Sequence, residues 1–250
     1  MEKVILNNRK YIIYSCGKPE NIIFLMTDKS DEESTSAIYS GIYQHFINNN
    51  NDRNMLKTDI IRKNLMLVFC MVDNWNNDLS PWKAPAVFGT EDFMGDGQST
   101  LNNITEICIP YLVKSFNIDI TSGRLFIGGY SLGGLFSLWS IYNTDIFKGA
   151  VCCSGSLWFQ GFEEYIKTQR LPKGCSIYLS LGDREHKTKN PIMSTVKSVT
   201  EHIYNIYQNI PEVENLKLEW NKGNHFNNPE ERLEKGIIWI IENTLHNIFF

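Results

Sequence analysis

The sequence predicts an α/β domain built on a mostly parallel sheet with helices on both faces. Short apolar runs rich in β-branched residues alternate with longer segments of helical periodicity along the chain, which is typical of parallel strands joined by helices. The longest apolar run, Leu65–Val72, has the length of a buried strand and is far too short to cross a membrane. The 250 residues contain no internal repeat or Gly/Pro-rich linker, so we expect a single domain over residues 1–250.

Eight strands are expected in all. Val4–Leu6 and Tyr11–Tyr14 flank the turn-forming pair Asn7-Asn8, a pattern that predicts a hairpin at the start of the chain. The six further strands are short apolar runs, expected at Ile22–Met26, Leu65–Val72, Arg124–Gly128, Ala150–Cys153, Ser176–Leu181 and Leu216–Trp220.

Helices are expected between these strands. Ser30 is followed by three acidic residues, which favours a helix start because acidic side chains stabilise the positive end of a helix. Asn228 can cap the last helix, and Pro229 then occupies a position that needs no N–H donor. The expected ranges are Ser30–Phe46, Ser99–Phe116, Leu132–Tyr142, Pro191–Gln208 and Pro229–Leu245.

Two longer loops interrupt this alternation. Asn48–Asn54 is a polar loop, whereas Asp73–Gln98 is too long for a plain connection and is therefore expected to cover the functional site. Aromatic rings in such a loop suit a bulky or aromatic ligand, or serve equally well to support the loop itself. Trp75 and Trp82 within the loop, together with Tyr130 farther along the chain, are the candidate substrate contacts.

Composition and charge narrow the classes of partner. The chain has 24 basic and 28 acidic residues, for a net charge of −4, so nucleic acid is a poor candidate partner. Met1–Lys10 lacks the apolar stretch of a signal peptide, and the six cysteines lack metal-binding spacing and lie mostly among apolar neighbours. We expect a cytoplasmic protein with reduced thiols, no membrane partner, no metal and no cofactor; the sequence does not specify an oligomeric state.

A candidate nucleophile lies in residues 128–134, Gly-Gly-Tyr-Ser-Leu-Gly-Gly, which contain the pattern G-x-S-x-G around Ser131. The pattern alone is weak evidence, but here it lies between an expected strand and an expected helix. At such a sharp turn a serine adopts a strained backbone that exposes its hydroxyl, and the flanking Gly129 and Gly133 remove side chains that would clash. The helix start also supplies N–H groups for a developing oxyanion.

A serine nucleophile needs a base and a group that orients the base. His225 follows the last expected strand, at the sheet edge where such folds place their sites, and is the candidate base. Glu185 and Asp183 both follow the preceding strand. We favour Glu185 because it lies farther out and can reach the neighbouring loop, and we keep Asp183 as the alternative.

Two backbone N–H groups are needed to hold the oxyanion. Leu132, directly after the candidate nucleophile, is expected to supply one of them. The other is expected from the loop after the third strand, where Asp28 and Lys29 are the candidate donors. The Asp28 carboxylate must then point away from the oxyanion or toward Lys29.

Three motifs together resemble the esterase family of α/β-hydrolases that includes enterochelin (siderophore) esterases, S-formylglutathione hydrolases, feruloyl esterases and mycolyltransferases. They are Gly-Tyr-Ser-Leu-Gly-Gly at Ser131, Ser-Gly-Ser-Leu-Trp at 154–158 and Gly-Asn-His-Phe at His225. The resemblance covers the chain from about Ile22 to Ile241 and implies an α/β-hydrolase fold, serine esterase activity, and a pocket for the acyl or alcohol group walled by Trp158. Relatives usually carry His-Gly or Asp-Gly after the third strand, where this chain has Thr27-Asp28.

Three functions fit these residues. The first is a serine ester hydrolase acting on a small-molecule ester, of siderophore or aryl type, through Ser131, His225 and an acidic residue. The second is a thioesterase or acyltransferase that uses the same residues with a different acceptor. The third is a non-catalytic binding protein on a hydrolase scaffold, which the altered Thr27-Asp28 sequence favours.

Overall fold

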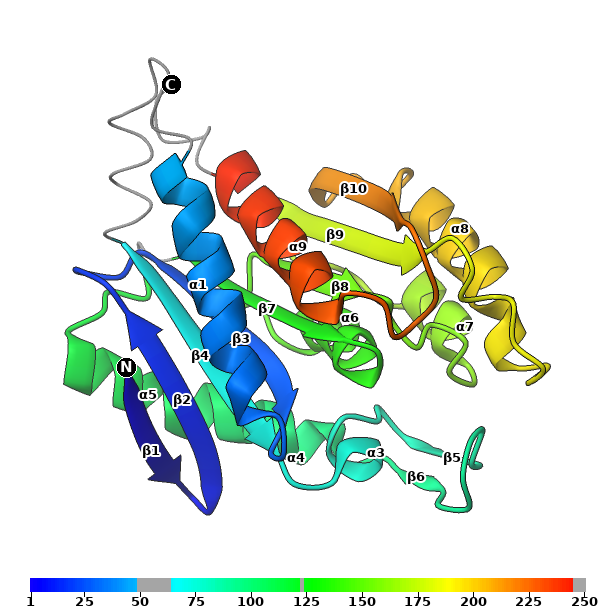
Figure 1. The fold of residues 1–250 in the computed structure, drawn as a ribbon, viewed down its shortest axis with the longest axis horizontal. Helices are drawn as coiled ribbons and strands as arrows, with labels where there is room; N and C mark the ends of the chain where they lie inside the picture. Colours follow the sequence, from blue (N-terminus) through cyan, green and yellow to red (C-terminus); the bar gives the residue numbers. More distant parts are fainter. Residues whose placement is uncertain (49–63, 122–123, 245–250) are drawn as a thin grey trace.

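The computed structural model describes residues 1–48, 64–121 and 124–244. Most of the polar loop expected at Asn48–Asn54, and Leu245 at the end of the last expected helix, lie outside the described residues. The described part forms one α/β layer structure with a central twisted sheet (Figure 1).

The sheet has eight strands, as the sequence predicts, in the order β1-β2-β4-β3-β7-β8-β9-β10. Strands β3, β4 and β7 to β10 run parallel, and the hairpin β1–β2 joins β4 in antiparallel orientation. The strands are β1 (Glu2–Leu6), β2 (Arg9–Ser15), β3 (Asn21–Asp28), β4 (Leu65–Val72), β7 (Arg124–Tyr130), β8 (Gly149–Cys153), β9 (Cys175–Gly182) and β10 (Val213–Asn221).

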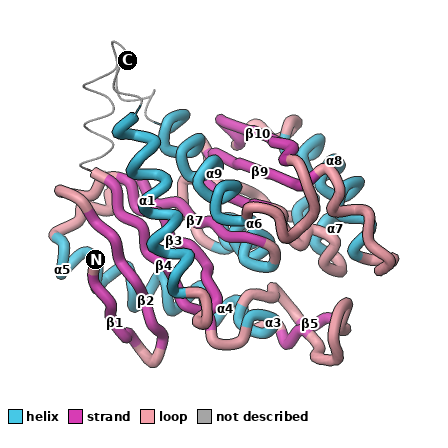
Figure 2. The backbone as a smooth tube through the Cα atoms, viewed as in Figure 1, coloured by secondary structure: helices cyan, strands magenta, loops and turns pink. Residues whose placement is uncertain are grey.

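Helices cover both faces of the sheet, so the central strands are apolar on both sides (Figures 1 and 2). The helices α1 (Glu32–Asn48) and α9 (Pro229–Thr244) pack on one face. The other face carries α4 (Gly97–Asn102), the π-helix η1 (Asn103–Cys108), α5 (Ile109–Phe116), α6 (Leu132–Asn143), α7 (Phe162–Thr168) and α8 (Val196–Tyr207). Alternate residues of β3 therefore enter different cores, with Phe24 on the second face and Leu25 on the first.

The long segment Asp73–Gln98 has its own secondary structure, which the sequence analysis did not predict. It contains the short helix α3 (Trp75–Asp78) and the two-stranded sheet β5 (Lys83–Ala84) and β6 (Phe93–Met94). The Ser80 hydroxyl accepts a hydrogen bond from the Gly95 N–H at 2.9 Å and thereby ties the two ends of the segment together. Helix α7 was also not predicted, and α8 begins at Val196 after a single 3-10 turn, Met193–Thr195, rather than at Pro191.

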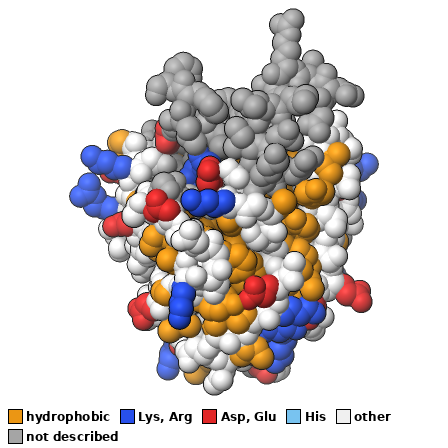
Figure 3. Space-filling model, turned by 90° about the vertical axis from the view of Figure 1, so that its left-hand side faces the viewer, with side chains coloured by type: hydrophobic (Ala, Val, Ile, Leu, Met, Phe, Trp, Pro, Cys, Tyr) orange, Lys and Arg blue, Asp and Glu red, His pale blue; other side chains and the backbone are white. Residues whose placement is uncertain are grey.

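The edge of the sheet at β1 is protected by charge. Lys3 on this strand forms an ion pair with Glu32 of α1, and Lys10 of the neighbouring strand pairs with the same glutamate. On the corresponding side of the molecule, basic and acidic side chains are interspersed with exposed apolar ones (Figure 3). Charged side chains on an edge strand oppose pairing with another chain.

Candidate active site

The ends of four parallel strands bring the predicted residues together. Ser131 follows β7, Ser154 follows β8, Glu185 lies three residues after β9, and His225 lies four residues after β10. Because the carboxyl ends of parallel strands meet at one edge of the sheet, residues far apart in sequence become neighbours there.

Ser131 has a strained backbone. Its φ and ψ are 56° and −122°, a region that side chains other than glycine rarely occupy. The turn is held by the Ser131 N–H, which donates to the Cys153 carbonyl at 3.0 Å. A Cβ atom on Gly129 would lie only 2.5 Å from the backbone of Gly133, so a glycine at residue 129 is required for the strand to turn this tightly into α6.

The three predicted side chains form a continuous hydrogen-bonded row. His225 Nδ1 lies 2.8 Å from Glu185 Oε2, and His225 Nε2 lies 3.1 Å from Ser131 Oγ. An ionised carboxylate only accepts hydrogen bonds, so the proton resides on Nδ1 of the neutral imidazole and Nε2 is free to accept the Ser131 proton. This arrangement activates a hydroxyl for nucleophilic attack.

Glu185 is buried but well supplied with hydrogen-bond donors. Burial is the largest single influence and raises the pKa of this carboxyl. The hydrogen bond and charge of His225 lower the pKa, as do the hydrogen bonds from the Gly182 N–H and the Ser154 hydroxyl. The net effect is a pKa below the ordinary value of a glutamate. The Gly182 N–H and the Ser154 hydroxyl both donate to Oε1, at 2.6 and 2.8 Å. Glu185 therefore stays ionised at neutral pH.

Asp183, the alternative acid, does not approach the histidine. Its Oδ1 accepts a hydrogen bond from the Gly223 N–H at 2.8 Å and lies 3.8 Å from Arg184 Nε. The side chain is about half exposed. Asp183 thus tethers the loop that carries His225 without contacting the imidazole ring, and Glu185 occupies the place of the acid.

The two candidate oxyanion donors after β3 differ in their hydrogen bonding. The Lys29 N–H donates to the Val72 carbonyl at 3.2 Å, so the prediction of Lys29 as a donor is wrong. Successive backbone N–H groups of a strand point to alternate sides, so the Asp28 N–H is directed away from β4, to the side of β3 on which β7 lies, and Asp28 stays a candidate donor. The Asp28 carboxylate turns away and accepts from the Ser30 N–H and hydroxyl, at 2.8 and 2.6 Å.

Leu132, the other expected donor, is the first residue of α6. The first N–H groups of a helix have no acceptor within the helix, and the helix dipole adds partial positive charge at the same place. Leu132 therefore stays a candidate donor to an oxygen bound beside Ser131.

A cavity of about 390 Å³ opens at Ser131 and His225. Its wall is mostly apolar and includes Trp75 and Trp158, two of the four aromatic residues that were expected to contact substrate. Its lining is Trp75, Phe88, Ser131, Ser154, Ser156, Trp158, Glu185, Met193, Val196, His225 and Phe226. The segment Asp73–Gln98 contributes Trp75 and Phe88, as expected for a segment that covers the site.

The other two aromatic candidates have different places. Trp82 does not line this cavity: its indole N–H donates to the Gln160 carbonyl at 2.9 Å, and its ring packs on Phe159 and Tyr165, as in the alternative in which it supports the loop. Tyr130 faces a second cavity, of about 290 Å³, on the other side of His225.

Comparisons with known proteins bear on the fold. No protein-family model matches the chain. The uncharacterized protein YbbA of Bacillus subtilis is 27% identical over 143 residues, which cover 56% of this chain and 57% of that protein.

Two solved structures are similar over most of the chain. Siderophore hydrolase EstA from Aspergillus nidulans has a TM-score of 0.65 and 15% identity, with 94% of this chain and 90% of that chain covered. An IroE-like serine hydrolase from Shewanella oneidensis has a TM-score of 0.69 and 14% identity, with 94% and 76% covered. The chain has the α/β-hydrolase fold. The resemblance drawn from the sequence motifs is thus confirmed at the level of the fold.

One residue of this site was missed by the sequence analysis. Arg232 of α9 is almost fully buried and donates to Glu185 Oε1 at 2.7 Å. A signal was present, because the buried side of α9 has a helical spacing that includes Arg232, comprising Arg232, Leu233, Gly236, Ile237, Ile240 and Ile241. A charged residue on an otherwise apolar stripe marks a buried ion pair.

Within residues 1–48, 64–121 and 124–244, no three His, Cys, Asp or Glu side chains are grouped so as to hold a metal ion. None of the helices described there has the length and apolar character needed to span a bilayer. All six cysteines are free, and five of them are buried.

Proposed function

We propose that this chain is a serine hydrolase that cleaves carboxylic esters through a covalent acyl-enzyme. The observation that carries the proposal is the row Ser131–His225–Glu185, with contacts of 3.1 and 2.8 Å, built on a strained turn at the start of a helix. This combination serves nucleophilic catalysis, whereas a glycine-rich turn needed only for packing requires no aligned imidazole and carboxylate.

The proposed reaction has two stages. In the first, His225 Nε2 takes the Ser131 proton as Oγ bonds to the carbonyl carbon, and the imidazolium then protonates the departing alcohol. In the second, His225 removes a proton from water, the hydroxide oxygen attacks the acyl carbon, the bond between that carbon and Ser131 Oγ breaks to release the carboxylic acid, and the proton returns to Oγ. The Leu132 and Asp28 N–H groups hold the oxyanion in both stages, and Glu185 stabilises the imidazolium.

The cavity favours an apolar or aryl substrate. Four aromatic side chains face it, from Trp75, Phe88, Trp158 and Phe226, and aromatic walls bind flat or bulky apolar groups. Two structural neighbours are named as a siderophore hydrolase and an IroE-like serine hydrolase. We therefore propose a small-molecule ester of aryl or siderophore type as the substrate class.

Active-site labelling tests the proposed chemistry. A fluorophosphonate probe is expected to label the protein once, at Ser131, with loss of fluoride, and p-nitrophenyl acyl esters are expected to be turned over. Peptide mass spectrometry locates the label, and p-nitrophenol release measures the rate. A protein that neither accepts the label nor hydrolyses any ester would be a binding protein on this scaffold. Preferential transfer of the acyl group to an added alcohol would indicate an acyltransferase.

Trp158→Ala is expected to raise KM for an aryl ester about tenfold, because the loss of an aromatic contact of about 1.4 kcal/mol weakens binding by that factor. The turnover number should change much less, since Trp158 lines the cavity but makes no described bond to the catalytic row. Trp220→Ala is the matched control, because Trp220 is 42% exposed on β10. Equal KM values for the two variants would contradict the proposed binding role.

A further inference from the structure

The first turn of α9 places a guanidinium inside the protein. The Arg232 side chain is only 2% exposed, and that of its partner Glu185 is 3% exposed. Burying a charge is costly unless it is paired and hydrogen-bonded. The hydrogen-bond acceptors of the buried Arg232 guanidinium therefore show which parts of the site it holds.

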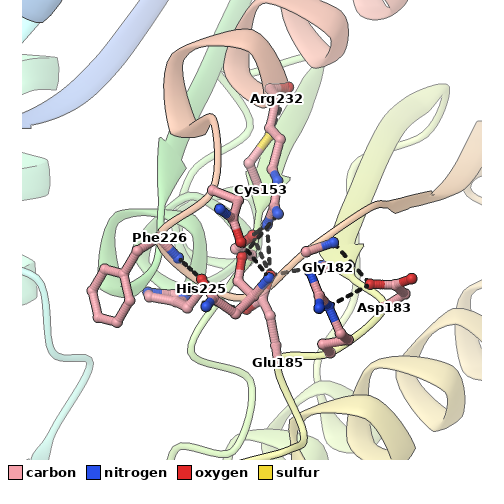
Figure 4. Close-up of polar contacts among 12 residues, drawn as sticks. Cys153, Gly182, Asp183, Glu185, His225, Phe226 and Arg232 are labelled. Carbon is pink, nitrogen blue, oxygen red and sulfur yellow. Dashed lines mark hydrogen bonds and ion pairs between the residues drawn. The ribbon is translucent and has the colours of Figure 1, made fainter.

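Arg232 binds four different parts of the site. Its Nη1 donates to Glu185 Oε1 at 2.7 Å, to Ser154 Oγ at 2.8 Å and to the Tyr130 hydroxyl at 3.1 Å. Its Nη2 donates to the Asn224 carbonyl at 2.9 Å. Figure 4 shows Arg232 reaching from its helix toward the Glu185 carboxylate. One guanidinium thus connects α9, β7 and the turns after β8, β9 and β10.

These bonds fix the backbone of the base as well as the carboxylate of the acid. The Asn224 carbonyl, bound by Arg232, immediately precedes His225, and the His225 carbonyl accepts from the Tyr130 hydroxyl at 2.6 Å. Tyr130 in turn is bound by Arg232. Arg232 therefore holds two consecutive carbonyls of the loop that carries His225. It holds the Asn224 carbonyl directly and the His225 carbonyl through Tyr130.

A purely charge-balancing role would not require this arrangement. Glu185 already receives hydrogen bonds from Gly182, Ser154 and His225, and a point charge such as lysine would suffice to neutralise it. The planar fork of arginine can bind a carboxylate with one nitrogen and a carbonyl with the other at fixed geometry, which the single ammonium of lysine cannot do.

We propose that Arg232 is a positioning residue, which locks Glu185 and the His225 loop into one geometry and places a fixed positive charge beside them. The inference rests on the proposed ester hydrolase activity. Arg232 lines neither the cavity at Ser131 nor the one beyond His225, so it acts through these two side chains rather than on the substrate.

The electrostatic consequence has a definite sign. A nearby positive charge disfavours uptake of another proton by the Glu185–His225 pair, whichever of the two side chains receives it. Removal of the Arg232 charge is therefore expected to move the acid limb of the pH–rate profile to higher pH. The other titratable groups that face this pair are Tyr130, Cys153, Asp183 and, around the second cavity, Asp28, Asp31 and Glu230. None of these groups is altered chemically when Arg232 alone is replaced.

Two substitutions separate the charge from the fork. Arg232→Met removes both and is expected to lower kcat at least tenfold, leave KM within about twofold and move the acid limb of kcat/KM up by about one pH unit. Arg232→Lys keeps the charge and is expected to lower kcat while the acid limb stays near that of the wild type. Arg124→Met is the control. Arg124 lies at the opposite end of β7, where its Nε donates to Asn21, so the substitution should leave kcat, KM and the acid limb unchanged.

A double-mutant cycle with Glu185→Gln tests whether Arg232 acts through Glu185. Residues that act as one unit are non-additive, so adding Arg232→Met to Glu185→Gln should lower kcat much less than it does in the wild type. Circular dichroism and thermal melts verify that each protein assayed is folded.

Unchanged kcat and an unmoved acid limb in folded Arg232→Met would overturn the inference, as would fully additive losses in the cycle. If Arg232→Met does not fold, Arg232→Lys decides: reduced kcat with an unmoved limb supports the inference, and wild-type kcat overturns it. Failure of the proposed function itself is recognised separately, because the wild type would then hydrolyse no ester.

Discussion

Replacing Ser131 with alanine is expected to lower kcat for ester hydrolysis on the order of 10⁶-fold, because no acyl-enzyme can form. The fold should be retained. Among the described residues, the Ser131 hydroxyl is hydrogen-bonded to two side-chain atoms, His225 Nε2 and Ser156 Oγ, at 3.1 and 3.3 Å. Alanine and serine also meet the same steric strain at a φ of 56°. The variant should therefore have the circular dichroism spectrum and melting temperature of the wild type.

Ser137→Ala provides a matched control. Ser137 lies in the same helix, and its buried hydroxyl donates to the Gly133 carbonyl at 2.7 Å, away from the catalytic row. The control should retain its turnover and its fluorophosphonate label, and Ser131→Ala should lose both. Activity that survives in Ser131→Ala would move the nucleophile elsewhere, with Ser156 as the first residue to examine.

Much of the fold was predictable because the strands of the main sheet are long enough to carry their own pattern. The segment Leu65–Val72 is buried at every position, which is why its run of apolar residues is continuous. The pair β5 and β6 has two residues in each strand, too few to show any periodicity. Helix α7 has seven residues, less than the length over which a helical pattern can be recognised.

The candidate site was predictable to the extent that it depends on strand order. Ser131 and His225 could be located because each follows a strand at the carboxyl edge of the sheet. The choice between Asp183 and Glu185 depends on the turn after β9, where the Glu185 N–H donates to the Gly182 carbonyl and folds the carboxylate inward. The order of residue types in the sequence does not determine which way this turn points the carboxylate. The Lys29 donor failed for a similar reason, since β3 extends its pairing with β4 beyond the expected end.

Replacing Glu185 with glutamine is expected to lower kcat about 10³- to 10⁴-fold. The amide is uncharged and cannot stabilise the imidazolium of His225. It can also present an N–H group to His225 Nδ1, which would favour the tautomer that cannot accept the Ser131 proton. Asp183→Asn should lose little activity, because its Oδ1 still accepts from the Gly223 N–H and the side chain does not touch the imidazole.

The same pair of variants distinguishes a Ser-His-Glu row from a simple Ser-His pair. Kinetics at saturating substrate give kcat for both. A small, equal loss in Glu185→Gln and Asp183→Asn would mean that the histidine needs no acid. A large loss in Asp183→Asn alone would exchange the roles assigned to the two carboxylates.

Stability should also respond to Glu185→Gln, with a definite dependence on pH. The substitution leaves the buried Arg232 without its counter-charge, so the free energy of unfolding at pH 7 should fall by about 3 kcal/mol. The pKa of Glu185 is lowered in the folded protein. Its ionised form therefore contributes stability above the ordinary pKa of about 4.3, and this contribution disappears as the pH falls through the folded pKa. Urea unfolding of wild type and variant should accordingly differ most near neutral pH and converge in strong acid, whereas a difference that grows with acidity would contradict the ionised state assigned to Glu185.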